Sequence, residues 1–493
     1  MLYHKIKLDN KIHSIFGNHL PGFFILGSLL FILANSVLIY FNNYIFSGAA
    51  ILVLLAYYSL FEFEKLYFFI VFSTSISIGL QWLYPNAPFN LALPSEPLML
   101  LLLFIILLKI IKEGIFEKSI LLHPISISIL FYLFWVFFTS ITSSMPIVSF
   151  KYLISKIWFI LPLYFFPVLL FRKQKNILLF FSLYIISFSI VIGYAINKHL
   201  SFGLFDKKAA HFVMQPFFND HTSYGAILAM YIPIIAGLFF YPKIKPIAKL
   251  FIISALSLFS LALLLSYTRA AWISILGISI VAILIKTKIK IRYIIFASTV
   301  AISLLFIYRL EIIDKLSKNK QDSSMDLSAH VKSMSNIATD ASNLERINRW
   351  NSAIRMFEER PILGWGPGTY MFQYAPFQMA RDKTIISTNF AEGGNAHSEY
   401  ISPLVEQGIP GFVFFLIVII TTVATSLKVY YRTIDIKVKL LSLISLLSLF
   451  TYYIHGLLNN YLDTDKASVP FWGLIALICS LDIYAMKEAD VDL

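Results

Sequence analysis

The sequence predicts an all-α polytopic membrane protein with about 12–14 transmembrane helices and one large external loop that contains short helices. Three observations predict this class. Of the 493 residues, 58% are hydrophobic and only 14% are charged, and one soluble core cannot bury that much apolar surface. Apolar runs of about 17–25 residues, the length that crosses a bilayer, recur along the chain. Lysine and arginine concentrate in alternate connections between these runs, as expected for cytoplasmic loops.

Fourteen apolar runs are candidate spans. They cover 22–41, 44–61, 65–84, 97–112, 122–141, 152–171, 176–196, 222–241, 247–267, 270–286, 290–308, 409–427, 439–457 and 467–486. The single cysteine, Cys479, lies inside the last of them, which excludes an intrachain disulfide and a cysteine-based metal site. The N-terminal segment 1–20 is polar and basic and has no small-residue cleavage signature, so we expect a retained first span.

The alternation of charge places the N-terminus inside and the segment 309–408 outside. We therefore divide the chain into an N-terminal bundle of about eleven spans (1–308), the large loop (309–408) and about three C-terminal spans (409–493). Most of the net charge of +13 comes from lysines and arginines in the short loops that are predicted to be cytoplasmic, so we expect no nucleic-acid partner.

The second half of the large loop shows a helical pattern over 344–359. Apolar side chains recur there at three- and four-residue spacing, while Arg346 and Arg349 share one flank. This pattern predicts an interfacial helix with its arginines at the lipid headgroups. The alternative is that the arginines only solvate a surface helix. The apolar stripe consists of Ile347, Trp350, Ile354 and Phe357.

Two groups of polar residues stand at the outer ends of spans. Arg269 lies in a connection too short to hold it away from the membrane, and a guanidinium there suits phosphate binding. The alternative is a snorkelling side chain. Asn219, Asp220 and His221 precede the span 222–241, where Asp220 or Asn219 is also a candidate helix cap.

The end of the loop combines glycine turns with titratable groups. Three alternating glycines in 361–370 indicate a rigid hinge that returns the chain to the membrane. His397 follows Asn395 and precedes Glu399, and a histidine exchanges protons near neutral pH. His397 is therefore a candidate general base. The alternative is a hydrogen-bonded histidine at a helix start.

Taken in order, these motifs resemble the O-antigen ligase and O-antigen polymerase superfamily over residues 210–415. The motifs are Pro216-Phe217-Phe218-Asn219-Asp220-His221-Thr222, Thr268-Arg269, the arginine-rich helix with Trp350, Pro361-Ile362-Leu363-Gly364-Trp365-Gly366-Pro367-Gly368, Asn395-Ala396-His397 and Glu406-Gln407-Gly408-Ile409-Pro410-Gly411.

The resemblance implies a bacterial inner-membrane enzyme whose active site faces the periplasm. Such an enzyme transfers a glycan from an undecaprenyl-diphosphate donor to a hydroxyl of lipid A-core, of a growing glycan or of a protein. The family's catalytic arginine and histidine map onto Arg269 and His397. Arg346, Arg349, Asn395, Glu399, Asn219 and His221 are then the candidate substrate-binding residues.

The chemistry implied needs no cofactor. Diphosphate is a good leaving group that requires charge neutralisation, which arginines supply, and no acidic pair with metal-ligand spacing stands out in the outer segments. We therefore expect metal-independent transfer with inversion at the anomeric carbon. Alternatives within the family are an O-antigen polymerase for lipopolysaccharide biosynthesis and a protein O-oligosaccharyltransferase. A secondary transporter or lipid flippase is the alternative of a different class, although it should carry ionisable residues near mid-span.

Overall fold

A computed structural model describes residues 20–41, 62–87, 89–114, 116–288, 341–383, 387 and 394–485. The chain divides into two compact units, Met1–Leu66 and Tyr67–Leu493. Helix α2 (Leu20–Tyr40) lies in the first unit, and α4 (Phe63–Ile76) begins there and continues into the second. The predicted spans 44–61 and 290–308 lie outside the described residues.

Where the structure describes the second unit, its regular elements are helices and one short antiparallel pair, β1 (Ile78–Gly79) with β2 (Ala92–Leu93). Its helices before the large loop are α5 (Leu80–Leu83), α6 (Ser95–Glu113), α7 (Lys118–Leu121), α8 (Pro124–Ile141), α9 (Pro146–Ile160), η2 (Leu161–Phe165), α10 (Phe166–Leu170), α11 (Gln174–Leu200), η3 (Ala209–His211), α12 (His221–Leu238), α13 (Pro246–Leu265) and α14 (Arg269–Lys286). Those that follow are α18 (Ala341–Glu359), α19 (Tyr370–Gln373), η4 (Ala375–Phe377), η5 (Ala380–Asp382), α20 (Ile401–Arg432), α21 (Ile436–His455), α22 (Asp465–Ser480) and η6 (Leu481–Ala485).

The predicted all-α membrane class is confirmed. Within the described part of the chain, nine helical stretches are long and apolar enough to cross a membrane, and each coincides with a predicted span. They are 124–141, 146–170, 174–200, 221–238, 246–265, 269–286, 401–432, 436–455 and 465–485. Helix α20 begins at Ile401, before the expected start at 409, because it continues through a kink at Gly408.

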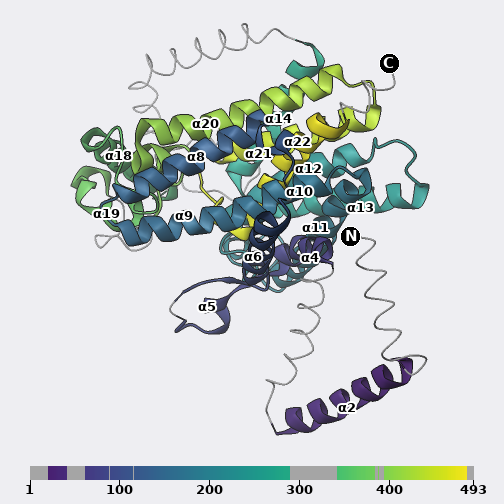
Figure 1. The fold of residues 1–493 in the computed structure, drawn as a ribbon. Coiled ribbons are helices and arrows are strands. Elements are labelled where there is room, and N and C mark those ends of the chain that lie inside the picture. The colour runs from purple at the N-terminus through teal and green to yellow at the C-terminus, as the bar shows by residue number, and fades with distance from the viewer. Residues whose placement is uncertain are drawn as a thin grey trace. The chain divides into compact units, whose positions relative to one another are not determined.

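The loop residues gather at one end of the helices. Figure 1 shows α8 and α20 side by side, with α18 and α19 at one end of this pair. The starts of α12 and α14 meet at the same end as the C-terminus of α21, since the Thr268 hydroxyl donates to the His221 carbonyl (2.7 Å) and the Glu399 N–H to the Gly456 carbonyl (2.8 Å). We call this the loop end of the bundle.

Two glycine-containing segments interlock at the loop end. Gly364, Gly366 and Gly368 all have positive φ angles (69°, 113° and 73°), which only glycine adopts without strain. They bend 361–369 around the start of α20. A Cβ on Gly364 would overlap the backbone between Glu406 and Gln407, so the two backbones touch directly. The expected rigid hinge is present, and its partner is the motif that begins α20.

Glu406 fastens this hinge. Its carboxylate oxygens accept hydrogen bonds from the N–H groups of Gly368 (2.9 Å) and Tyr370 (3.1 Å), and its carbonyl accepts one from Gly366 (2.8 Å). At Gly408 (φ 70°) the backbone leaves helical geometry, so the Ile409 N–H donates to the Pro361 carbonyl (2.9 Å). A single carboxyl group that accepts from two backbone donors holds both segments in place, because buried N–H groups need an acceptor.

We expect Gly408→Ala to destabilise the protein by at least about 2 kcal/mol. The left-handed backbone and the overlap of a new Cβ with the Ile362 carbonyl oxygen each cost about 1–3 kcal/mol. Thermal unfolding in detergent measures the loss. Gly193→Ala on α11 is the matched control because its Cβ would meet no atom within 4 Å. Equal unfolding temperatures for the two variants would contradict the interlock.

Candidate active site

Helix α18 confirms the predicted helix, but its most buried side differs from the predicted apolar stripe. Ile354 in that stripe is 47% exposed. The buried side is partly polar and packs toward α20 and the segments after α19. Polar side chains inside such a contact need hydrogen-bond partners, which periodicity alone does not reveal. The buried residues of this side are Glu345, Asn348, Ser352, Ala353 and Met356.

Arg349 joins α18 to the segment 394–397, which contains His397. Its Nε donates to Glu345 Oε1 (2.9 Å), and its Nη1 donates to the Asn395 carbonyl (3.1 Å). The guanidinium also lies 5.6 Å from the centre of the Tyr374 ring. Gly394 is required beside it, because a Cβ there would overlap the guanidinium. The arginine therefore does not simply solvate the surface of the helix.

His397 is held by its backbone. Its φ is 47°, which is uncommon for a residue with a side chain, and its N–H donates to Asn395 Oδ1 (3.1 Å). Burial lowers the pKa of His397 to about 3, and the nearby Arg349 and Arg346 lower it in the same direction. The imidazole is therefore neutral at neutral pH, with a lone pair available to accept a proton.

The start of α12 supplies a second group of polar residues. Asp220 is its cap, because its Oδ1 accepts from the N–H groups of Thr222 (2.8 Å) and Ser223 (2.7 Å). The capping alternative is thus confirmed for Asp220, whereas Asn219 only accepts a bond on its carbonyl from Gln215 (2.9 Å). Capping occupies one carboxylate oxygen of Asp220 and leaves its charge at the loop end.

His221 lies where the two groups meet. Its ring centre is 4.1 Å from that of His211, and Arg269, Arg346 and Asp220 lie within electrostatic range of it. Asp220 and Arg346 are also within range of His397. Arg269, Arg346, His221 and His397, which come from four separate parts of the sequence, therefore gather at the loop end.

The Glu399 carboxylate accepts its hydrogen bonds from other residues of the protein. Its Oε1 accepts hydrogen bonds from the Tyr452 hydroxyl (2.6 Å) and from the N–H groups of Tyr461 (2.7 Å) and Leu462 (2.9 Å). Burial raises its pKa, which the nearby Lys156 partly opposes. The carboxylate thus ties the residues after His397 to the connection between α21 and α22.

Sequence reasoning missed that connection. The Tyr461 hydroxyl bonds to the Thr222 hydroxyl at the start of α12. Lys156 is buried in an ion pair with Asp463 (2.6 Å). His455 bonds Asn459 through Nε2 (3.1 Å), and among the described residues its buried Nδ1 has no hydrogen-bond partner. The available signal was the mostly polar run 459–463 between two spans.

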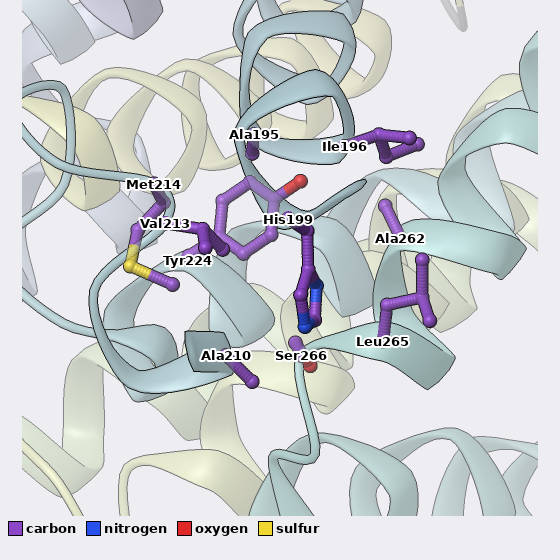
Figure 2. Close-up of a pocket in the computed structure, with 10 residues that line it drawn as sticks. All are labelled: Ala195, Ile196, His199, Ala210, Val213, Met214, Tyr224, Ala262, Leu265 and Ser266. Carbon is purple, nitrogen blue, oxygen red and sulfur yellow. The ribbon is translucent and has the colours of Figure 1, made fainter. Parts of the chain in front are cut away.

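A small cavity near His199 is not a substrate site. Figure 2 shows the His199 ring among small apolar side chains of α11 and α13. The cavity measures about 10 Å³, the space of one water at most, and His199 Nε2 already bonds the Asp206 carbonyl (2.8 Å). In the ranges that the structure covers, no group of three or more His, Cys, Asp or Glu side chains is placed to hold a metal ion.

We expect Glu399→Ala to be clearly less stable than Glu399→Gln. Alanine leaves the Leu462 N–H and the Tyr452 hydroxyl without their acceptor, at about 1–3 kcal/mol for each unsatisfied group, while the Tyr461 N–H keeps only the Tyr452 hydroxyl oxygen (3.1 Å). Glutamine keeps an acceptor oxygen for all three groups. Unfolding in detergent and hydrogen exchange at the Tyr461 and Leu462 amides measure the difference. If both variants unfold and exchange like the wild type, the anchoring role of Glu399 is wrong.

Comparison with known proteins identifies one family. Residues 252–416 match the family described as O-Antigen ligase, which is about one third of the chain. The matched part includes Arg269, Arg346, Arg349 and His397. No curated protein matches the chain.

Proposed function

We propose that this chain, which matches the O-Antigen ligase family over residues 252–416, is a ligase of that kind. It transfers a glycan from an undecaprenyl-diphosphate donor to an acceptor hydroxyl, with lipid A-core as the acceptor. The reaction takes place at the loop end, on the periplasmic face of the inner membrane. The observation that carries this proposal is the gathering of a neutral histidine and several arginines at one end of apolar spans.

Arg269 and Arg346 bind the diphosphate of the donor. Arginine remains charged in a poorly hydrated site and binds phosphate oxygens in pairs. Helices α12 and α14 both begin at this end, so their N-terminal N–H groups add partial positive charge. These charges are in place before the reaction and stabilise the diphosphate as negative charge builds on it.

His397 accepts the proton of the acceptor hydroxyl. As that proton leaves, the oxygen forms a bond to the anomeric carbon and the bond from this carbon to the diphosphate oxygen breaks. Attack from the side opposite the diphosphate inverts the anomeric centre. Arg349 and Asn395 position the histidine through the bonds described above, so the base does not have to be ordered during the reaction.

We expect His397→Ala to lower kcat about 10²–10⁴-fold, the usual contribution of a general base, with little change in donor affinity. Arg269→Ala should lower kcat/KM about 10²–10³-fold, because a donor to the developing charge is lost. Transfer by protein in lipid nanodiscs, with an undecaprenyl-diphosphate glycan and lipid A-core, measures both. Arg381→Ala is the control, since this loop arginine is 77% exposed.

Undiminished transfer by both variants, or transfer that EDTA abolishes, would contradict this mechanism. Movement of intact donor across the bilayer without any transfer would support a flippase instead.

The pH dependence follows from the arginines beside His397. Bound diphosphate offsets their positive charge, so the pKa of His397 rises from its low value in the free protein. On the acid side of the pH–rate profile, the fall in kcat/KM reports the pKa of the base in the free enzyme, and the fall in kcat reports its pKa in the substrate complex. We therefore expect the acid limb of kcat at a higher pH than that of kcat/KM. Rates measured from pH 4 to 8 test this: because the free-enzyme pKa is about 3, kcat/KM should stay level down to pH 4 while kcat falls within the range, and acid limbs that coincide would contradict it.

A further inference from the structure

A second cavity, of about 190 Å³, opens beside the proposed active site at the loop end. It is bounded by the β1–β2 pair, the start of α6, the residues before α12 and the connection into α22. At many times the space that one water needs, it is large enough for a sugar ring. Aromatic side chains form part of its wall, and polar side chains form the rest. The aromatic residues are Phe217, Phe218 and Tyr461.

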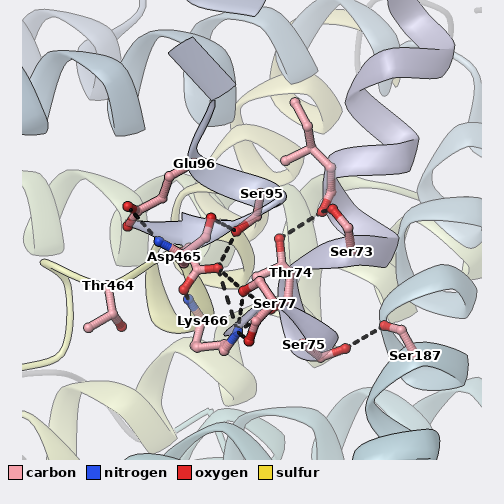
Figure 3. A network of polar contacts seen from close by, with 12 residues as sticks. Ser73, Thr74, Ser75, Ser77, Ser95, Glu96, Ser187, Thr464, Asp465 and Lys466 are labelled. Carbon is pink, nitrogen blue, oxygen red and sulfur yellow. Dashed lines mark hydrogen bonds and ion pairs between the residues drawn. The ribbon is translucent and has the colours of Figure 1, made fainter. Parts of the chain in front are cut away.

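A buried polar network forms one wall of this cavity (Figure 3). The Asp465 carboxylate accepts hydrogen bonds from the hydroxyls of Ser77 and Ser95, each at 2.5 Å. Lys466 donates to the carbonyls of Thr74 (2.5 Å) and Ser77 (2.8 Å). Because these charges are buried and bonded to one another, the network is a rigid wall and not a free cation site.

Glu96 keeps an acceptor for a ligand. It is only 8% exposed, and it lines the cavity. Its Oε2 accepts from the Ala92 N–H (3.0 Å), while its Oε1 has no hydrogen-bond partner among the residues that the structure describes. A hydroxyl or ammonium group that enters the cavity would donate a hydrogen bond to this oxygen.

The cavity also carries negative charge. Four carboxylates line it. Lys466 pairs with Asp465 (3.6 Å) and Lys156 with Asp463 (2.6 Å), which leaves Asp220 and Glu96, whose pKa burial raises to about 7, without a paired cation among the lining residues. A sugar that bears a phosphate or carboxylate would therefore be repelled, whereas hydroxyl and ammonium groups would find acceptors. The four carboxylates are Glu96, Asp220, Asp463 and Asp465.

Two of the lining residues connect the cavity to the proposed active site. Asp220 lies within electrostatic range of both His397 and His221. Tyr461 bonds Thr222 at the start of α12, and its N–H donates to Glu399, two residues after the histidine. A sugar in the cavity would thus extend toward the groups that hold the diphosphate and the attacking hydroxyl.

We propose that this cavity binds one neutral or amino-bearing sugar ring of the glycan substrates and rejects an anionic ring. That the cavity binds a sugar ring does not depend on the proposed function. Only the statement that this ring is part of a substrate rests on it. The ring belongs either to the acceptor or to the donor glycan, and both present the same hydroxyl groups to Glu96.

Ala92→Trp tests the cavity by filling it. Ala92 lines the space, whereas Leu93, its neighbour on β2, does not, since successive strand residues point to opposite faces. Leu93→Trp is therefore the matched control, and Glu96→Gln removes the charge while keeping an oxygen for the Ala92 N–H. Saturation-transfer NMR on the full chain in nanodiscs measures binding of methyl α-glucoside, methyl glucosaminide and glucose 6-phosphate.

We expect the first two probes to bind the wild type and Leu93→Trp, to lose their signal in Ala92→Trp, and to bind Glu96→Gln more weakly. Any signal from glucose 6-phosphate, which the proposed phosphate-binding arginines can also hold, should be the same in the wild type and Ala92→Trp. Unchanged binding of the neutral glycosides in Ala92→Trp, or a glucose 6-phosphate signal that Ala92→Trp removes, would overturn the proposal.

Transfer kinetics then identify the source of the ring. If the ring belongs to the acceptor, Ala92→Trp raises the KM for the acceptor at least tenfold and leaves that for the donor unchanged; if it belongs to the donor, the reverse holds. A wild type that binds the neutral glycosides but transfers no glycan would refute the proposed function while supporting the cavity as a sugar site.

Discussion

The loop end depends on the contact between Glu406 and the glycine hinge 361–369. The carboxylate of Glu406 accepts two backbone N–H groups of the hinge, and Gly408, which has no Cβ, lets the backbone of α20 approach the Ile362 carbonyl closely. These bonds attach the loop directly to α20. Because α18 leads into the hinge, the same contact fixes Arg346 and Arg349 relative to the spans. The positions of the proposed substrate-binding groups thus follow from a backbone interaction in which no catalytic residue takes part.

The electrostatic arrangement explains why such a rigid attachment is needed. Arginines and helix N-termini repel one another when they are brought together away from water. Glu345 and Asp220 offset part of this repulsion, since Glu345 pairs with Arg349 (2.9 Å) and Asp220 caps α12. Burial and the nearby arginines lower the pKa of His397 and keep the imidazole neutral. A site of this kind holds its charges in place before the substrate arrives, which is the condition for strong electrostatic stabilisation.

Local patterns in the sequence predicted the spans, the loop helix and the turns. Among the described residues, nine predicted spans are helices of sufficient length, whereas the predicted span 65–84 is wrong because α4 ends at Ile76 before β1. Helix α18 follows from its periodicity, and Asp220 precedes a helix start as a cap should. Contacts between distant residues were not predictable in this way. Glu399 meets Tyr452 and Leu462, and Lys156 meets Asp463, through packing that no short-range spacing encodes. His397 and Arg269 lie in short sequence motifs and were therefore predicted as site residues. The cavity beside them is formed by segments that are distant in the sequence, so it was not predicted.

The central claim is that Arg269, Arg346 and His397 act on one diphosphate-linked substrate. Cryo-electron microscopy of the protein in lipid nanodiscs, with a non-reactive phosphonate analogue of the undecaprenyl-diphosphate glycan, tests this claim most directly. The account predicts density for the diphosphate between Arg269 and Arg346, with His397 facing the anomeric carbon. Density for the diphosphate elsewhere on the protein, or at the opposite end of the helices, would contradict it.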